Sequence, residues 1–165
     1  MTNSQIIITD AGPLIALAKT GYLSILKKLF KKVLLPPAVY SELNLGSFKK
    51  GNTELTKAIF ETKWLEVTKP LKTAETLKTA LDIGEAEAIT LAKHKNLVLL
   101  IDERKGRKIA QKLGVKIIGT GAILIAAKKK KIISQVASCL DSLQSCGYHI
   151  SKSLRQKILA LANEK

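Results

Sequence analysis

The stretch LDIGEAEAITLAKHKNLVLLIDERKGRK, residues 81–108, joins a helix to a short strand and carries carboxylates at both ends. Asp82 and Glu85 open the helix, and residues 97–101 form an all-apolar segment of strand length. Asp102 follows that segment directly. Because open α/β sheets bind ligands at the carboxyl ends of their strands, we expect Asp102 to lie at a ligand-binding edge.

The same order of strand and acid occurs near the N-terminus. Residues 5–9, QIIIT, form a run of β-branched residues that is typical of a parallel strand covered on both faces. Asp10 follows at once, and a helical pattern then begins, with Pro13 suited to the first helical position. Asp10 therefore lies between a strand end and a helix start. The structural alternative is that Asp10 only caps that helix.

Further strands are expected at residues 33–35, 65–67 and 115–118, with helical patterns between them, including residues 22–32 and a helix capped by Asn52. Strands that alternate with helices predict a three-layer α/β/α fold around a central parallel sheet of four to five strands. Two more amphipathic helices, residues 132–145 and 151–162, follow. We expect a single domain over residues 1–165, with its core at about 5–125 and a C-terminal helical extension at about 130–165.

Four acids are expected to meet at one edge of this sheet, because each follows a strand or lies in the first turns of the next helix. They are Asp10, Glu42, Glu85 and Asp102, and Glu87 is expected to be solvated or to support them. Carboxylates in one cleft repel each other, and Mg²⁺ or Mn²⁺ relieves that repulsion because hard cations prefer oxygen ligands. Two alternatives stay open: Asp82 and Glu85 also fit a helix capping box, and Glu42 also fits a solvated helix surface.

Basic residues dominate the charge, with 28 Lys and Arg against 13 Asp and Glu and a formal net charge of +15. This balance favours polyanionic partners, and the aromatic content of 4% argues against a base-stacking platform. Four cations follow Asp102 in the first turns of a helix, where the helix dipole disfavours positive charge. They are candidate nucleic-acid contacts: Arg104, Lys105, Arg107 and Lys108. The alternative is that the charge serves solubility alone.

Other classes of site and location find little support. Cys139 and Cys146 are seven residues apart on one predicted helix, too far for a disulfide, and are expected to be small core residues. No cluster of His and Cys offers a zinc site. No apolar run reaches the roughly 18 residues of a membrane span, and the first residues lack the pattern of a signal peptide, so we expect a soluble, cytoplasmic protein.

Taken in this order, the motifs resemble the PIN domain nucleases, a family that includes the VapC-type toxins of toxin–antitoxin pairs. The resemblance rests on IIITDAGPLIALAK (residues 6–19, with Asp10), PPAVYSEL (36–43, with Glu42), GEAEAITLA (84–92, with Glu85) and LVLLIDE (97–103, with Asp102). The motifs DAGPL and GEAEAI are similar to those of a VapC-like subgroup that differs from the best-known toxins.

The resemblance implies that the four acids coordinate Mg²⁺ or Mn²⁺ and that the activity is metal-dependent cleavage of single-stranded RNA. It makes RNA the expected partner and an antitoxin protein a candidate one. In the family a small hydroxyl residue often follows the first acid, whereas Ala11 follows Asp10, so Thr9 or Thr120 is expected to supply that hydrogen bond. The two C-terminal helices lack a counterpart in the compact toxins and are expected to pack within the chain or to form a homodimer contact.

Two other functions stay open. The first is a non-catalytic nucleic-acid-binding or regulatory module on the same fold, which the positive charge alone would serve. The second is a phosphotransfer protein that uses Asp10 as its nucleophile. The second is disfavoured, because residue 12 is glycine where an Asp-x-Asp motif would place another acid.

Overall fold

The computed structural model describes residues 6–47 and 50–165. Within them, five parallel strands form one sheet in the order β3-β2-β1-β4-β5. The strands are β1 (Ile6–Thr9), β2 (Lys32–Leu35), β3 (Leu65–Val67), β4 (Leu99–Leu100) and β5 (Ile117–Ile118). The predicted α/β fold with a central parallel sheet is confirmed. Residue 5 of the first predicted strand lies outside the described residues.

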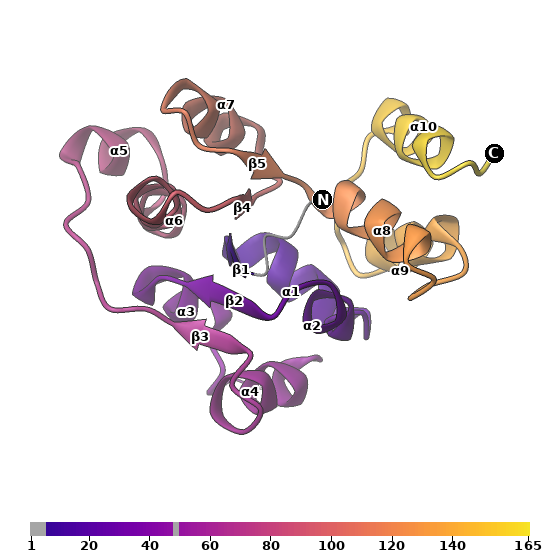
Figure 1. Ribbon diagram of the computed structural model, residues 1–165, viewed down its shortest axis with the longest axis horizontal. Coiled ribbons are helices and arrows are strands. Elements are labelled where there is room, and N and C mark those ends of the chain that lie inside the picture. The colour runs from indigo at the N-terminus through magenta and orange to yellow at the C-terminus, as the bar shows by residue number, and fades with distance from the viewer. Residues whose placement is uncertain (1–5, 48–49) are drawn as a thin grey trace.

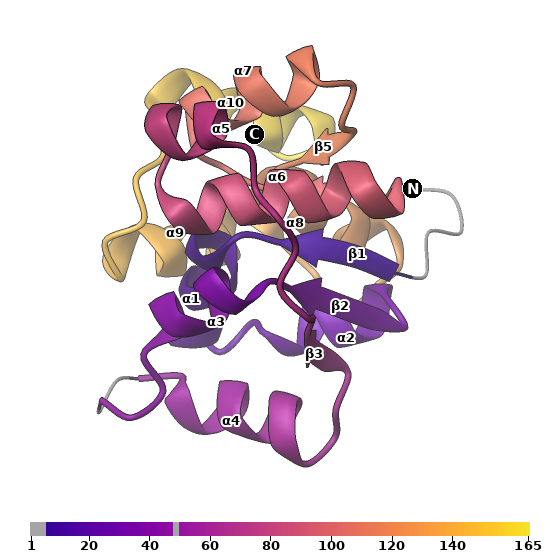
Figure 2. The same cartoon turned by 90° about the vertical axis from the view of Figure 1, so that its left-hand side faces the viewer.

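Helices cover both faces of the sheet and form the outer layers (Figures 1 and 2). They are α1 (Ala11–Lys19), α2 (Ser24–Leu29), α3 (Pro37–Leu43), α4 (Asn52–Phe60), α5 (Glu75–Ala80), α6 (Ile83–Lys95), α7 (Arg104–Lys112), α8 (Thr120–Lys129), α9 (Val136–Ser145) and α10 (Lys152–Leu161). Helix α6 packs on β1 and β4 between α5 and α7, whereas α1, α2 and α8 lie on the opposite face. Helices α9 and α10 pack on α8, and α4 packs against α1 and β3.

The path of the chain reverses direction at the centre of the sheet. From β1 the chain builds outward through β2 to β3, and it then crosses back through α5 and α6 to place β4 on the other side of β1. The ends of β1 and β4 are therefore neighbours although their connections run in opposite directions. Such a point of reversal leaves a crevice outside the carboxyl ends of the two strands, which is where open α/β sheets bind ligands.

Several element ends differ from the prediction. The predicted helix 22–32 is shorter, because Phe30 is extended (φ −129°, ψ 146°) and Lys32 already belongs to β2. The predicted helix 132–145 begins only at Val136, because the Ile132 amide turns back and donates to the Ala127 carbonyl at the end of α8 (2.8 Å). Apolar spacing marks which residues face the core but does not reveal these hydrogen bonds.

Two local predictions near helix starts were also wrong. Asn52 is the first residue of α4 rather than its cap, and its side-chain amide donates to the carbonyls of Leu45 and Ser47, closing the loop before α4. Pro13 is the third residue of α1 instead of the first.

The apolar segments 97–101 and 115–118 form only two paired residues each, although Ile101 still donates to the Ile118 carbonyl beyond β4 (3.0 Å).

One hydrophobic core joins the sheet to the C-terminal helices, since Leu99 and Leu100 belong to the same cluster as Ile158. Trp64 is buried and belongs to this core. Cys139 is buried, but Cys146 is exposed, so the prediction that both cysteines are core residues was wrong for Cys146. Among the described residues, no helix has the length and apolar character needed to cross a bilayer.

Candidate active site

The site is built on the carboxyl ends of β1 and β4. The Asp10 amide donates to the Leu100 carbonyl (3.0 Å), which fixes the end of β1 beside the end of β4. Asp102 follows β4 after one further buried residue, Ile101. Helix α3 contacts both α1 and α6, and Figure 2 shows the strand ends and the start of α6 on the same side of the molecule. Acids on four segments are thereby brought to one edge of the sheet.

Asp10 is a buried carboxylate whose hydrogen bonding is incomplete. The residue is 7% exposed and its Oδ1 atom is buried without a hydrogen-bond partner. It occupies the N-cap position of α1, but its side chain makes no capping hydrogen bond. Burial and the nearby charges of Asp82 and Asp102 raise the pKa of Asp10 to about 6, against a lowering contribution from the Ala11 backbone. Helix capping alone therefore does not account for Asp10.

Glu85 lies in the first turn of α6 and is 8% exposed, and its Oε2 atom is also buried without a partner. Burial first, and then Asp82 and Asp10, raise the pKa of Glu85 to about 8. The carboxylate lies against Gly106 of α7, where a Cβ atom would come within 2.8 Å of Oε2. Glycine at position 106 is therefore needed for the Glu85 carboxylate to occupy this space.

Asp82 caps α6 and accounts for one half of the predicted capping box. Its carboxylate accepts a hydrogen bond from the Glu85 amide (2.8 Å). The Glu85 carboxylate is instead directed toward α7, as its contact with Gly106 shows. The cap therefore explains the position of Asp82 but gives the buried Glu85 Oε2 atom no hydrogen-bond partner among the described residues.

Glu42 reaches the same region from α3. The side chain is exposed as a whole, but its carboxylate lies against the backbone of Gly84, so closely that a Cβ atom at residue 84 would overlap it. Partial burial and the charges of Asp82 and Asp10 raise the pKa of Glu42 to about 7, against a lowering hydrogen bond with Gly84. The electrostatic coupling shows that Glu42 and Asp10 belong to one negative region.

Asp102 differs from the other acids because both of its oxygens are hydrogen-bonded. The Thr120 amide donates to Oδ1 (2.8 Å) and the Thr120 hydroxyl donates to Oδ2 (2.6 Å). The strand register explains this pair: Leu100 lies opposite Ile118, so the residues two positions further on face each other. Asp102 is thus held in one orientation by the start of α8.

The predicted supporting residues have other partners than expected. The Thr9 hydroxyl donates to the backbone carbonyl of Asp10 (2.8 Å), and the hydroxyl of Thr120 donates to Asp102. The expectation that either would support the Asp10 carboxylate was therefore wrong. The Glu87 carboxylate accepts from the Ala38 amide in the first turn of α3 (2.9 Å), so Glu87 holds α3, and with it Glu42, against α6.

The four predicted nucleic-acid contacts divide into two groups. Arg104, Lys105 and Lys108 are exposed on α7. Arg107 is half-buried and turns toward the site, where its Nη1 atom donates to the Ile101 carbonyl (2.7 Å). A Cβ atom on residue 119 would lie 3.1 Å from both Arg107 Nη1 and Asp102 Oδ1, so Gly119 allows these two groups to lie close together.

Tyr148 is a site residue that the sequence did not indicate. It lies beyond α9, in the segment that precedes α10, and lines one cavity together with Asp102 and Thr120. Burial and the negative charge of Asp102 raise the pKa of Tyr148 above its ordinary value, so the phenol stays protonated at neutral pH. No local sequence signal identifies Tyr148, because more than forty residues separate it from Asp102.

The acids share one region but not one ready-made ligand set. Over residues 6–47 and 50–165, no three His, Cys, Asp or Glu side chains lie close enough together to hold an ion between them. The expected tetrad of direct ligands is therefore not assembled. The donor chemistry nevertheless fits a hard divalent cation, because Asp10 Oδ1 and Glu85 Oε2 are buried carboxylate oxygens without a hydrogen-bond partner in the described part of the chain.

The chain matches a family model described as PIN domain (DUF3368) over residues 6–164. No curated protein matches significantly. Six chains of solved structures match, among them a PilT N-terminus domain protein from the hyperthermophilic archaeon Sulfolobus solfataricus. That protein is 19% identical, with a TM-score of 0.49, and the match covers 74% of this chain and 92% of that one. PIN domains are generally nucleases that use divalent metal ions. The family model spans nearly the whole sequence, and this chain belongs to the PIN domain family.

Proposed function

We propose that this chain is an endoribonuclease that cleaves phosphodiester bonds of single-stranded RNA and requires Mg²⁺ or Mn²⁺. One observation carries the proposal: Asp10 and Glu85, near the point where the path of the chain reverses across the sheet, bury carboxylate oxygens that have no hydrogen-bond partner among the described residues. An unpaired buried carboxylate is costly, and its pKa rises as a result. A fold that retains two such groups at a ligand-binding edge is typical of a functional site.

Asp10 and Glu85 are the residues we propose to hold the cation, with Glu42 and Asp102 at the periphery of the same negative region. Among the residues that the structure describes, fewer than three carboxylates lie close enough to share one ion, which suits Mg²⁺ because it usually retains several waters. A bound ion would offset the clustered charge and lower the pKa of a bound water. Without an ion, Glu85 holds a proton at neutral pH, because its pKa is about 8.

The surrounding residues prepare the site for a polyanion. Thr120 fixes both oxygens of Asp102, so this carboxylate keeps its orientation without further reorganisation. Arg107 and Asp102 both flank Gly119 and line the same cavity, so a phosphate approaching Asp102 would meet the Arg107 guanidinium. The net charge of +15 would attract RNA from a distance and speed its association.

A toxin-like role is part of this proposal, because the motifs around the four acids resemble a family that includes the VapC-type toxins. In that case a short neighbouring reading frame would encode a DNA-binding antitoxin that binds this chain. Co-expression of the two proteins should then relieve growth arrest caused by this chain alone. A chain that does not slow growth when expressed alone would act as a stand-alone nuclease.

Cleavage of a fluorescent single-stranded RNA tests the proposal. Wild-type protein should cut the RNA with Mg²⁺ or Mn²⁺ but not with EDTA. Asp10→Asn and Glu85→Gln should each lower the rate by about a hundredfold or more, which corresponds to about 2.7 kcal/mol of transition-state stabilisation. Glu61→Gln is the matched control, because Glu61 is an exposed acid at the end of α4. Its rate should equal that of the wild type.

Full activity in both site variants would contradict the proposal, provided that circular dichroism shows all four proteins to be folded. Cation-independent cleavage would contradict it as well. RNA binding by the wild type without cleavage in any cation would favour the alternative, a non-catalytic nucleic-acid-binding module. This alternative is supported by the incomplete set of metal ligands among the described residues.

A further inference from the structure

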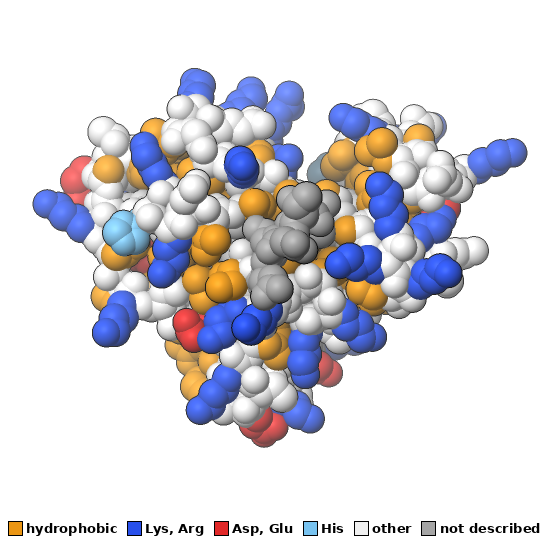
Figure 3. Space-filling model, in the orientation of Figure 1, with side chains coloured by type: hydrophobic (Ala, Val, Ile, Leu, Met, Phe, Trp, Pro, Cys, Tyr) orange, Lys and Arg blue, Asp and Glu red, His pale blue; other side chains and the backbone are white. Residues whose placement is uncertain are grey.

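A groove extends from Asp102 away from Asp10, Glu42 and Glu85, which are not part of its lining. It has a volume of about 300 Å³, the lower end of the range for small-molecule pockets, which suits a single nucleotide. Its lining includes Asp102, Arg107, Tyr148, Leu154, Lys157 and Leu161. In Figure 3 the outline of the molecule is hollowed between the surfaces of α7 and α10, the two helices that contribute Arg107 and Leu154. The groove therefore extends from the acidic edge to the C-terminal helices.

The outer wall of the groove is held firmly in place. Gly121, at the start of α8, leaves room for α10, since a Cβ atom there would come within 2.6 Å of the Ile158 side chain. At the other end, Lys128 pairs with Glu164 (2.9 Å) and donates to the Ala162 carbonyl (2.8 Å). The Glu164 carboxylate also accepts from the first amides of α9. The C-terminal helices are thus a fixed part of this wall.

The lining combines apolar and cationic groups in a way that matches a nucleotide. Leu154 and Leu161 on α10 are 48% and 58% exposed, which is unusual for leucines that lie against a groove. An apolar wall of this kind suits the face of a nucleobase. Lys157 lies on the same helix and Arg107 on α7, so cations lie on both sides of the groove and suit phosphates. Tyr148, which lines the groove together with Asp102, contributes a phenol group.

We propose that this groove binds one nucleotide of a single-stranded RNA next to the scissile phosphate, with the base against Leu154 and Leu161 and its phosphate between Arg107 and Lys157. This inference rests on the proposed function for the identity of the polymer. Asp102 belongs both to the groove and to the acidic edge, so a strand whose phosphate reaches the acids would place a neighbouring nucleotide in the groove. The C-terminal helices would then select among substrates.

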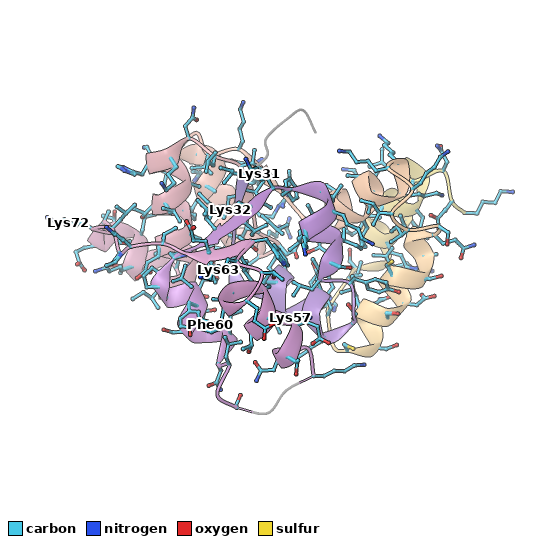
Figure 4. All side chains as sticks on the ribbon, turned by 60° about the horizontal axis from the view of Figure 1, so that its bottom comes forward. Lys31, Lys32, Lys57, Phe60, Lys63 and Lys72 are labelled. Carbon is cyan, nitrogen blue, oxygen red and sulfur yellow. The ribbon has the colours of Figure 1, made fainter. Side chains whose placement is uncertain are left out.

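Binding of a fluorescein-labelled single-stranded RNA octamer, followed by anisotropy in EDTA, tests the groove without cleavage. The groove variant carries Leu154→Glu and Lys157→Glu. The control carries Phe60→Glu and Lys57→Glu on α4, far from α10 (Figure 4), where Phe60 is 54% exposed. Each pair lowers the formal net charge of +15 by 1 + 2 = 3, to +12. General electrostatics therefore weaken both variants alike, and we expect the groove variant to bind at least about tenfold more weakly than the control.

Equal affinities for the two variants would overturn the inference, and so would a wild type that does not bind the octamer. Circular dichroism and thermal unfolding check that both variants are folded. The same samples are then assayed for cleavage with Mg²⁺, which separates the two proposals. If the wild type cleaves RNA and both variants lose RNA affinity equally, the groove proposal is wrong and the nuclease proposal stands. If only the groove variant loses RNA affinity and no protein cleaves RNA, the nuclease proposal is wrong and the groove is supported as a nucleotide site.

Discussion

Replacing Glu85 by Gln is expected to stabilise the protein at neutral pH when no divalent cation is present. The Glu85 side chain is 8% exposed, its Oε2 atom has no partner, and its pKa rises from 4.5 to about 8 through burial and the charge of Asp82. Among the described residues no Lys or Arg forms an ion pair with it. Ionising Glu85 therefore costs more in the folded state than in the unfolded chain.

The sign and size of the effect follow from proton linkage. Because the folded-state pKa is raised, the stabilisation is present below about pH 4.5 and is lost as the pH rises toward about 8. Inside this window the ionisation of Glu85 lowers the free energy of unfolding by up to about 1.4 kcal/mol per pH unit. Between about pH 5 and pH 7.5, the variant should gain about 2–3 kcal/mol of unfolding free energy relative to the wild type.

Urea unfolding followed by circular dichroism in EDTA measures this difference at several pH values. Glu61→Gln, at an exposed site on α4, should follow the wild type throughout. Adding Mg²⁺ at about a hundred times its dissociation constant should restore about 2.7 kcal/mol to the wild type but little to the Gln variant. Parallel pH profiles for the wild type and the Gln variant would contradict this prediction, because Glu85 would then ionise as easily in the folded state as in the unfolded chain.

Two further predictions concern the same edge of the sheet. Thr120→Val removes the hydroxyl that donates to Asp102 Oδ2 and should lower the rate of RNA cleavage by about ten- to a hundredfold. Thr120→Ser keeps a hydroxyl and should retain most of the activity. Equal cleavage rates in the two variants would assign Thr120 a packing role. Mg²⁺ binding at neutral pH should release protons, since Glu85 and Glu42 have pKa values of about 8 and about 7. Calorimetry in buffers of different ionisation enthalpy measures this release, and buffer-independent heats would contradict it.

The sequence was sufficient to predict the sheet and the acids that follow its strands. A buried run of apolar residues that ends in an acid defines both Asp10 and Asp102, and parallel strands bring such acids to one edge. Glu85 was separated from its neighbour Glu87 by helical spacing alone. These inferences are local, so they do not depend on how distant segments are packed.

The relations between distant segments could not be predicted from the sequence. The hydrogen bonds from Thr120 to Asp102 depend on the register of β4 and β5, which apolar patterning does not specify to a single residue. Tyr148 reaches Asp102 only because α9 and α10 fold back on α8. The incomplete ligand set depends on side-chain orientations, and the sequence predicts only that the acids lie at the same edge.

Anomalous diffraction from crystals soaked in Mn²⁺ locates a bound ion without assuming any activity. We expect a manganese peak within coordination distance, about 2.0–2.3 Å, of Asp10 Oδ1 and Glu85 Oε2, and no peak at that position in the Glu85→Gln variant. Wild-type crystals without a peak between these two oxygens, under conditions in which the protein cleaves RNA, would contradict this expectation.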